Sequence, residues 1–355
     1  MTIIYFILLL TVIICIHELG HLLAAKLFCV YCYEFSFGMG PVLLKKKGKE
    51  TQYSLRALPI GGFVAMAGEN SEEVEAYADV EVADDRKLTN KPWWQKVIIM
   101  LAGVTMNFLL AFLIFAMVML NYGEVQLSPK AIVGEIVENS PAAKAGFEVG
   151  DVILKITQED GRSIEPSSFS DMQTFGIGYE GKEVYLVERD GQQISLEVQP
   201  ELDEESGLYL IGIRSGEPEV VKVNFLNCWK YGFLHMVDMM KTMFTTLGTL
   251  FRGRGLNQLS GPVGIYQAAG TYAAMGFSVF LQLMAMLSVN VGIFNLLPLP
   301  VLDGGQVVIT LVEAITRHKI SDKIKTAVMA ACWVLLIALM LYVTWNDISK
   351  IIFGG

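Results

Sequence analysis

Long apolar runs recur along the chain and are separated by segments of mixed polarity. Four runs have about the 20 residues that a helix needs to cross roughly 30 Å of hydrocarbon. The first run has no basic segment ahead of it and is interrupted by ionisable residues, which argues against a cleaved signal peptide. The pattern predicts a polytopic α-helical membrane protein with four transmembrane helices, at residues 1–27, 97–120, 277–297 and 326–344.

The region between the first two runs has a strand-like pattern. Residues 53–67 are apolar and glycine-rich with a break at Gly61-Gly62, which predicts a membrane-associated β-hairpin region. A strand edge near a membrane site would accept a substrate segment as an added strand, and so expose peptide bonds that a helix hides in its own hydrogen-bond ladder. The alternative is an amphipathic hairpin that only rests on the interface.

A soluble domain is predicted between the second and third runs. Residues 131–137 alternate like a strand, and further strands are expected near residues 184–189 and 193–198. The motif S-P-A-x-x-A-G-x-x-x-G-D-x-I at residues 140–153 resembles PDZ domains of the bacterial protease-associated type. The segment is therefore expected to be one inserted PDZ-like α+β domain. Such a domain binds an extended peptide by strand addition; the alternative is a spacer that limits access by size.

An amphipathic helix is predicted after this domain. Residues 224–250 mix apolar and charged positions, which favours a helix lying on the membrane surface, and residues 260–264 predict a turn before the third span.

The distribution of charge sets the expected orientation. The connection after the third span holds four Lys and Arg residues within residues 317–325, and basic residues are also frequent between the first two spans. Because basic loops stay in the cytoplasm, both termini and the acidic segment 121–222 are predicted to be extracytoplasmic in a multi-pass protein of the cell membrane. The net charge of −9 argues against nucleic acid as a partner.

Two histidines and a glutamate interrupt the first apolar run as His17-Glu18-Leu19-Gly20-His21, an H-E-x-x-H motif. Positions i and i+4 share one face of a helix, so both imidazoles can reach one ion. Glu18 beside them can take a proton from an attacking water molecule. Ionisable groups inside a membrane span are costly unless they have a function; the alternative is a polar cluster that only packs helices together.

A third metal ligand is expected after the third run, because a catalytic zinc usually takes three protein ligands and one water. Residues 295–305 read N-L-L-P-L-P-V-L-D-G-G. The two prolines cannot continue a helix, and irregular backbone at membrane depth is tolerated only where protein or a cavity satisfies it. Asp303 could complete a His-His-Asp site; its alternative role as a helix N-cap is compatible with ligation.

The two motifs and the domain between them together resemble a known family. H-E-x-x-H in the first span, N-x-x-P-x-P-x-L-D-G in the third and a PDZ-like domain between spans two and three resemble the site-2 protease family, in its bacterial RseP/RasP-type branch. The likeness covers nearly the whole chain. Residues 35–40 resemble the family's membrane-reentrant segment, and residues 102–108 resemble the start of its second span, except that Val104 replaces a proline.

The resemblance implies an intramembrane zinc metalloprotease that cleaves transmembrane segments of other membrane proteins. His17, His21 and Asp303 match the family's zinc ligands, and Glu18 matches its catalytic base. The expected cofactor is therefore Zn2+. Residues expected to bind the substrate's unwound segment are Asn295, Pro298, Pro300, Gly61, Gly62 and Phe63.

Partners and divisions of the chain follow from the same resemblance. The expected partners are the lipid bilayer, single-span membrane proteins as substrates, and a possible peptide ligand of the PDZ-like domain; anti-sigma factors and remnant signal peptides are the leading substrate candidates. The expected divisions are 1–120 with two spans, the zinc motif and the β region, 121–222 with the PDZ-like domain, 223–275 with the amphipathic helix and linker, and 276–355 with two spans and the aspartate motif.

Two other classes of function compete with a protease. A non-catalytic scaffold that presents a PDZ domain would not need an intact set of two histidines, a glutamate and an aspartate. A metal transporter would use the same ligands as a transit site, but it would more often show repeated halves, and the sequence shows no internal repeat. A zinc assay separates the scaffold from the protease, and a cleavage assay separates the transporter.

Overall fold

The computed structural model describes residues 1–69, 77, 80–127, 129–203, 207–216, 218–251 and 260–353. Within these residues, four helical segments are long and apolar enough to cross a membrane. They confirm helices at the four positions predicted to span a membrane, with ends that shift by a few residues. The segments are Thr2–Leu27 in α1, Trp93–Tyr122 in α3, Phe277–Asn295 in α8 and Lys323–Ser349 in α10.

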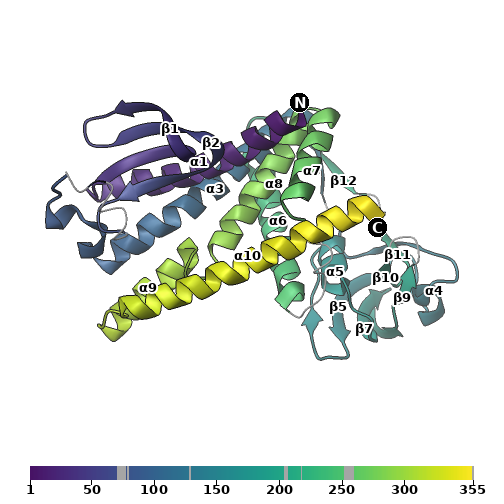
Figure 1. The fold of residues 1–355 in the computed structure, drawn as a ribbon. Coiled ribbons are helices and arrows are strands. Elements are labelled where there is room, and N and C mark those ends of the chain that lie inside the picture. The colour runs from purple at the N-terminus through teal and green to yellow at the C-terminus, as the bar shows by residue number, and fades with distance from the viewer. Residues whose placement is uncertain are drawn as a thin grey trace. The chain divides into compact units, whose positions relative to one another are not determined.

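Further helices and small sheets accompany these four helices (Figure 1). The further helices are α4 Pro141–Ala145, α5 Phe169–Gly176, α6 Cys228–Phe251, α7 Pro262–Met275 and α9 Asp303–Thr316, with 3-10 turns at Asp84–Arg86 and Leu88–Asn90, and the full helix α10 runs over Asp322–Phe353. The strands are β1 Cys32–Lys47, β2 Gln52–Met66, β3 Glu124–Leu127, β4 Val133–Ile136, β5 Val152–Gln158, β6 Ser163–Ile164, β7 Glu183–Arg189, β8 Gln192–Val198, β9 Glu201–Asp203, β10 Leu208–Leu210, β11 Ile213–Ser215 and β12 Glu219–Lys222.

The chain folds into two compact units, and each is described by itself. The first unit consists of Met1–Asn121, Trp229–Met240 and Asn257–Gly355, and it contains the four candidate spans. The second unit consists of Tyr122–Cys228 and Lys241–Leu256.

Small residues let the helices of the first unit approach closely, as is common among membrane helices. A side chain at Gly20 of α1 would collide with the carbonyl oxygen of Ala102 on α3. A side chain at Gly292 of α8 would lie 2.8 Å from the Phe108 ring of α3. The close α1–α3 and α3–α8 contacts place the H-E-x-x-H helix and the helix preceding Asp303 against the same partner, α3.

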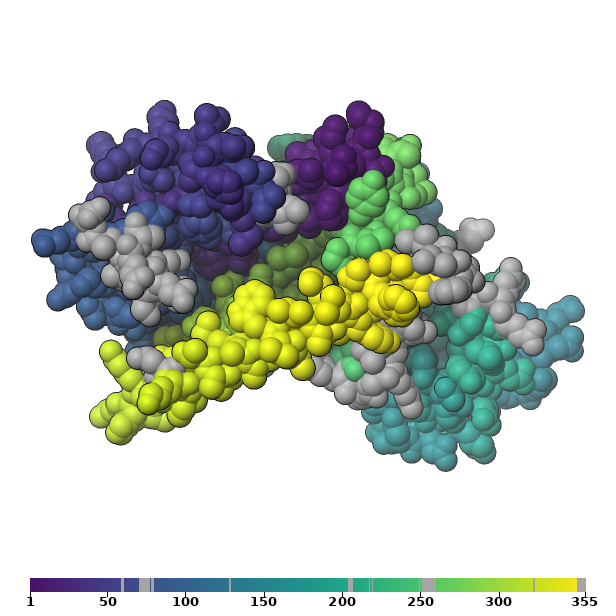
Figure 2. Space-filling view, in the orientation of Figure 1, coloured from purple at the N-terminus to yellow at the C-terminus, as the bar shows by residue number. Residues whose placement is uncertain are grey.

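The residues expected to form a turn at 260–264 instead begin helix α7. Gly261 is the N-cap and Pro262 occupies the first helical turn, where its missing N–H costs nothing. The buried Asp347 carboxylate of α10 accepts hydrogen bonds from the backbone N–H groups of Gly261 and Gly264, at 2.9 and 2.8 Å. Helix α10 is otherwise largely exposed, and Figure 2 shows it as the yellow helix along the visible surface. This exposure is expected of an apolar helix that faces lipid.

The strands β1 and β2 form a small sheet with four segments. Residues 34–37 of β1 pair with residues 62–65 on one side and with residues 52–55 on the other, and residues 44–47 pair with residues 52–55. Residues 62–65 of β2 therefore form one edge of the sheet. The structure differs from the expected hairpin within residues 53–67, because both halves of β2 pair with β1.

A buried carboxylate holds this sheet together. Glu34 is 2% exposed and accepts hydrogen bonds from Ser54, Tyr77 and Arg56, at 2.5, 2.5 and 2.7 Å. Burial raises the pKa of Glu34, but these hydrogen bonds and the charge of Arg56 outweigh it and hold that pKa below its ordinary value. The Arg56 guanidinium also lies 4.9 Å from the centre of the Phe63 ring, which connects the network to the edge segment.

The first part of α6 packs against α3 within the first unit. The His235 ring meets the Phe115 ring edge-on, with centroids 4.7 Å apart, and a side chain at Gly232 would lie 2.6 Å from the Ala116 nitrogen. The expected helix is confirmed; its position on the membrane surface stays a prediction.

The second unit contains a four-stranded sheet in the order β6-β5-β7-β8, with short pairs β4–β11 and β9–β10. The strands expected near residues 131–137, 184–189 and 193–198 are confirmed as β4, β7 and β8. Strands β3 and β12 pair antiparallel from Glu124 with Lys222 to Leu127 with Glu219. The Tyr122–Cys228 part of this unit thus begins and ends near one two-stranded ribbon.

The G-D-x-I part of the motif has a structural role in the second unit. Asp151 is 1% exposed, and it accepts hydrogen bonds from the Arg189 guanidinium at 2.7 Å and from the Glu148 N–H at 2.9 Å. Burial raises the pKa of Asp151, but these bonds outweigh it and hold the pKa below its ordinary value. Ile153, beside it, belongs to the hydrophobic core.

Candidate metal centre

The two histidines of the H-E-x-x-H motif lie one turn apart on α1 and turn the same ring atom toward each other. His17 Nε2 and His21 Nε2 are 3.2 Å apart, and both side chains are buried. Helical spacing produces this arrangement, since residues i and i+4 stand above one another on one face. The imidazoles can therefore share one ligand-binding position.

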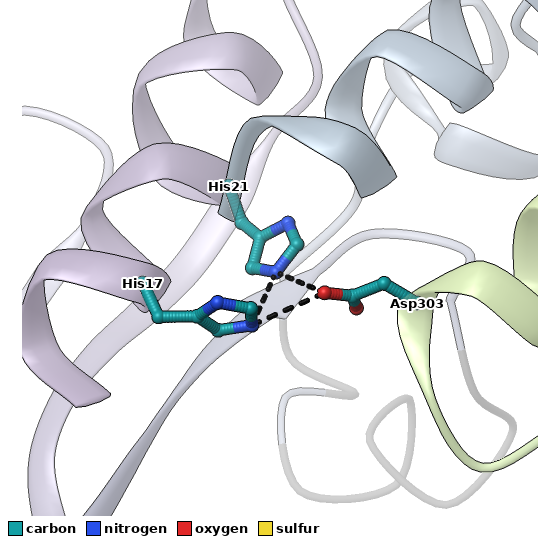
Figure 3. Close-up of side chains that lie close together, drawn as sticks. All are labelled: His17, His21 and Asp303. Atoms are coloured by element: carbon teal, nitrogen blue, oxygen red, sulfur yellow. Dashed lines mark hydrogen bonds and ion pairs between the residues drawn. The ribbon is translucent and has the colours of Figure 1, made fainter. Parts of the chain in front are cut away.

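Asp303 reaches this pair from the far end of the chain (Figure 3). Its Oδ2 lies 3.1 Å from His17 Nε2 and 3.5 Å from His21 Nε2, and the three side chains point toward one another. Asp303 begins α9, whose N-cap is Leu302 with no side-chain capping bond. The alternative role of Asp303 as an N-cap is therefore not the one that the structure shows.

The loop before α9 is compact and fixes the position of Asp303. Residues 296–302 are not helical, as the two prolines predict. A side chain at Gly304 or Gly305 would collide with the backbone of this loop, and the Gln306 amide donates to the Pro300 carbonyl at 2.5 Å. The glycines thus allow the start of α9 to fold back onto the proline loop.

The three ligand atoms have the separations that a tetrahedral zinc site requires. Bonds of about 2.0–2.2 Å to nitrogen and oxygen put tetrahedral ligand atoms roughly 3.3 Å apart, and the observed separations are 3.1, 3.2 and 3.5 Å. Within the described residues, Asp303 Oδ2 is buried and receives no hydrogen bond. Two imidazoles and an unsatisfied carboxylate oxygen that converge in this way fit a divalent zinc ion.

The outer nitrogens of both rings have partners of their own. His21 Nδ1 lies 2.8 Å from the Ile99 carbonyl oxygen of α3, which fixes Nδ1 as the protonated atom and leaves the Nε2 lone pair for a metal. His17 Nδ1 lies 3.3 Å from the side-chain amide of Asn107, also on α3. Helix α3 therefore orients both rings.

Gly103 of α3 leaves the space in which the two rings lie. A Cβ atom at this position would collide with His21 Nε2 and would lie 2.8 Å from Cε1 of both His17 and His21. Any larger residue would displace the rings at their ligand atoms. Gly103 and Asn107 lie within residues 102–108, which resemble the start of the family's second span, and no role at the site was predicted for either.

Glu18 lies between the histidines and the edge of the β sheet. Its carboxylate accepts a backbone hydrogen bond from Val64 of β2. A Cβ atom at Gly62 would lie 3.6 Å from Glu18 Cγ and 2.8 Å from the Ser36 carbonyl oxygen. The absence of a side chain at Gly62 thus brings the sheet edge into contact with Glu18.

The other residues expected to bind substrate occupy two places. Gly61, with a φ of +87°, and the half-buried Phe63 flank Gly62 in β2. Asn295 is the last residue of α8, and Pro298 and Pro300 lie in the loop that follows. In the described part of the chain, Asn295 makes no hydrogen bond or ion pair to the three ligand candidates, so the structure does not bring it directly to them.

Comparison with known proteins adds independent information. The model of the peptidase family M50 matches residues 5–339. A predicted zinc metalloprotease of Clostridium acetobutylicum is 37% identical over 95% of this chain and 94% of its own length. The regulator of sigma-W protease RasP of Bacillus subtilis is 32% identical over 99% of both chains, and the metalloprotease MmpA of Caulobacter vibrioides is 34% identical over 96% of this chain and 94% of its own.

Proposed function

Because the chain belongs to peptidase family M50 and is a zinc metalloprotease of the membrane, we propose that it cleaves transmembrane segments of single-span membrane proteins at the site on α1 and α9. The observation that supports this proposal is that His17, His21 and Asp303 each offer one ligand atom, and that these atoms all lie within 4.8 Å of one another. The surrounding helices are apolar enough to span a bilayer, so a peptide bond cut here is cut at membrane depth.

Each residue of the site has one role. His17, His21 and Asp303 would hold the zinc ion, which would act as a Lewis acid on the scissile carbonyl and make water a better nucleophile. Glu18 takes the proton of the attacking water and gives it to the leaving amine. The backbone hydrogen bond from Val64 holds the Glu18 carboxylate in place for both transfers.

The edge of β2 beside Glu18 supports the proposed mode of substrate binding. In an antiparallel pair, every second residue turns its N–H and C=O away from its partner strand. Val64 turns its N–H toward Glu18, so Gly62, two residues earlier, turns its backbone groups to the same side. A substrate segment that unwinds here can pair with this edge as an added strand, and Gly61, Gly62 and Phe63 would line it.

The loop of Asn295, Pro298 and Pro300 supports a second substrate contact. It leads directly into Asp303 and is held against the start of α9. We assign the Asn295 amide to the substrate backbone, where it would replace a hydrogen bond that the substrate helix loses on unwinding.

The proposed function includes the orientation of the chain in the membrane and the class of its substrates. The basic loops after the first and third spans support an orientation in which both termini and the unit inserted between α3 and α6 lie outside the cell. One relative is named as a regulator of sigma-W, and this supports anti-sigma factors as substrates; remnant signal peptides are the second candidate class. The resemblance to PDZ domains supports a peptide-binding or size-limiting role for the inserted unit.

Zinc-dependent cleavage of a membrane substrate is the first expected result. The purified enzyme in liposomes is expected to cut a single-span substrate, to lose this activity when a chelator removes zinc, and to regain it when zinc alone is added back, because His and carboxylate ligands bind zinc reversibly. The cleavage position is read by mass spectrometry. A cut outside the apolar segment, or full activity after removal of the metal, would contradict the proposal.

Removal of the inserted unit is expected to widen the range of substrates. Strands β3 and β12 meet at Leu127 and Glu219, so a short Gly-Ser link can replace residues 128–218 and keep the ribbon paired. If the unit excludes substrates by size, the shortened enzyme cuts substrates whose outer domain is intact, whereas the full chain cuts only trimmed ones.

The control for this experiment keeps the unit but weakens it. Asp151→Ala removes the buried one of the two carboxylate partners of Arg189 inside the unit and leaves the residues of the ribbon unchanged. Equal cleavage of trimmed substrate by the shortened and full enzymes shows that the site is intact. If the shortened enzyme still rejects untrimmed substrates, the unit is not the size filter.

A further inference from the structure

A single asparagine connects the metal centre to the helix that precedes Asp303. Asn107 of α3 is completely buried, with an exposed fraction of 0%. Its side-chain amide lies 3.3 Å from His17 Nδ1, and its backbone carbonyl accepts a hydrogen bond from Ser288 of α8 at 2.8 Å. A polar side chain buried in a membrane helix is costly unless it has a partner and a function.

The tautomer of His17 determines what Asn107 must do. His17 Nε2 is the atom that faces Asp303 and His21, at 3.1 and 3.2 Å. A ring nitrogen that binds a metal must carry a lone pair, so in neutral His17 the proton resides on Nδ1. Nδ1–H is then a donor, and the atom of Asn107 that faces it must be an acceptor.

The amide orientation follows from this requirement. In the structure, Nδ2 of Asn107 faces His17 Nδ1, and within the described residues Oδ1 has no hydrogen-bond partner. The oxygen and nitrogen of an amide exchange places by rotation about the last side-chain bond. Either orientation leaves one atom of the amide unpaired, the acceptor Oδ1 in one and the donor Nδ2 in the other, so this feature does not distinguish them. The His17 tautomer does distinguish them, because its Nδ1–H requires that Oδ1 be the atom that faces it.

We propose that Asn107 is a positioning residue for the metal centre, whose Oδ1 accepts the Nδ1–H of His17 and thereby presents Nε2 as a ligand. This inference rests on the proposed role of His17. The Ile99 carbonyl performs the same task for His21 at 2.8 Å, so α3 supplies one acceptor to each imidazole. The hydrogen bond from Ser288 holds the backbone of Asn107 against α8. The Asn107 side chain is thereby fixed in position relative to the helix that leads to Asp303.

Zinc affinity of the purified protein, measured by competition with a chromophoric chelator, tests the inference without any cleavage assay. Asn107→Leu removes the acceptor at similar volume and is expected to weaken zinc binding by about 10–100-fold, the usual cost of losing an outer partner of a ligand. Asn107→Asp offers acceptor atoms alone and is expected to bind zinc at least as tightly as the native chain. A role limited to filling space would not be rescued by aspartate.

Controls separate this inference from the proposed function. His17→Ala is expected to lose zinc; if it retains native affinity, the zinc site itself is misassigned. If His17→Ala loses zinc while Asn107→Leu keeps native affinity, the role of Asn107 alone is refuted. The role is also refuted if Asn107→Leu and Asn107→Asp both lose zinc affinity while their metal-free forms unfold at the same temperature as the metal-free native chain. Should Asn107→Leu fail to fold, Asn107→Ala is judged by the same criteria.

Discussion

Glu18→Gln is expected to stop peptide cleavage while zinc remains bound. The amide has nearly the shape of the carboxylate and can still accept the hydrogen bond from Val64, but it cannot take a proton from water. Loss of a general base lowers a rate by roughly 10²–10⁴-fold. Glu18 is not among the three residues whose ligand atoms converge, so zinc content should stay at the native level.

A single-turnover cleavage assay in liposomes, together with the zinc-to-protein ratio of the same samples, measures both expectations. Glu313→Gln is the matched control: this carboxylate pairs with Lys325 on the neighbouring helix and lies outside the site, so cleavage should stay near the native rate. Native cleavage by Glu18→Gln would remove Glu18 from the mechanism. Loss of zinc in that variant would make it a ligand or a structural group instead.

Asp303→Asn is expected to release zinc and, with it, all cleavage. The change keeps the volume of the side chain but removes the negative charge that two neutral imidazoles cannot replace. A lost ligand should weaken zinc binding by more than the roughly 100-fold that a lost outer partner costs. Among the described residues, the ion pairs of the Asp303 side chain are those with His17 and His21, so the folded helices should persist.

Zinc affinity by chelator competition and helix content by circular dichroism separate these effects. Glu313→Gln again serves as the control on the same helix. A variant that retains native zinc affinity would show that Asp303 is no ligand, and the His-His-Asp assignment would be wrong even though the three side chains lie together.

The spans and the histidine pair could be predicted from sequence because each depends on local periodicity. An uncharged run of membrane length and an i, i+4 pair of histidines are fixed by helical geometry alone. It was also predictable that Asp303 would lie in or next to a loop at the membrane edge, because the two prolines after α8 cannot continue a helix. Its distance to the histidines was not, because it depends on how α8 packs against α3.

The residues that shape the site could not be predicted from local pattern. Gly103 matters because the imidazoles of α1 fill the space beside it, and Asn107 because His17 lies next to it. Both contacts join positions about 90 residues apart in sequence. One signal was present: Asn107 carries a polar amide inside an uncharged span, where polar groups mark functional sites by default.

The β region shows a second limit of sequence patterns. The apolar, glycine-rich pattern of residues 53–67 indicated strands correctly, but the partner of each half depends on the register with β1, where residues 34–37 pair on both sides. The buried Glu34 that fixes this register is charged, and alternation would place it on a polar face. Its partners Ser54, Tyr77 and Arg56 become visible only in three dimensions.

X-ray absorption at the zinc edge of the purified native enzyme tests the central claim most directly. The arrangement of His17, His21 and Asp303 predicts two imidazole nitrogens and one carboxylate oxygen at about 2.0–2.2 Å from the ion, together with a signal from the imidazole carbons. A sulfur neighbour at about 2.3 Å would place the zinc on cysteines such as Cys29 and Cys32, and the account of the site would be wrong.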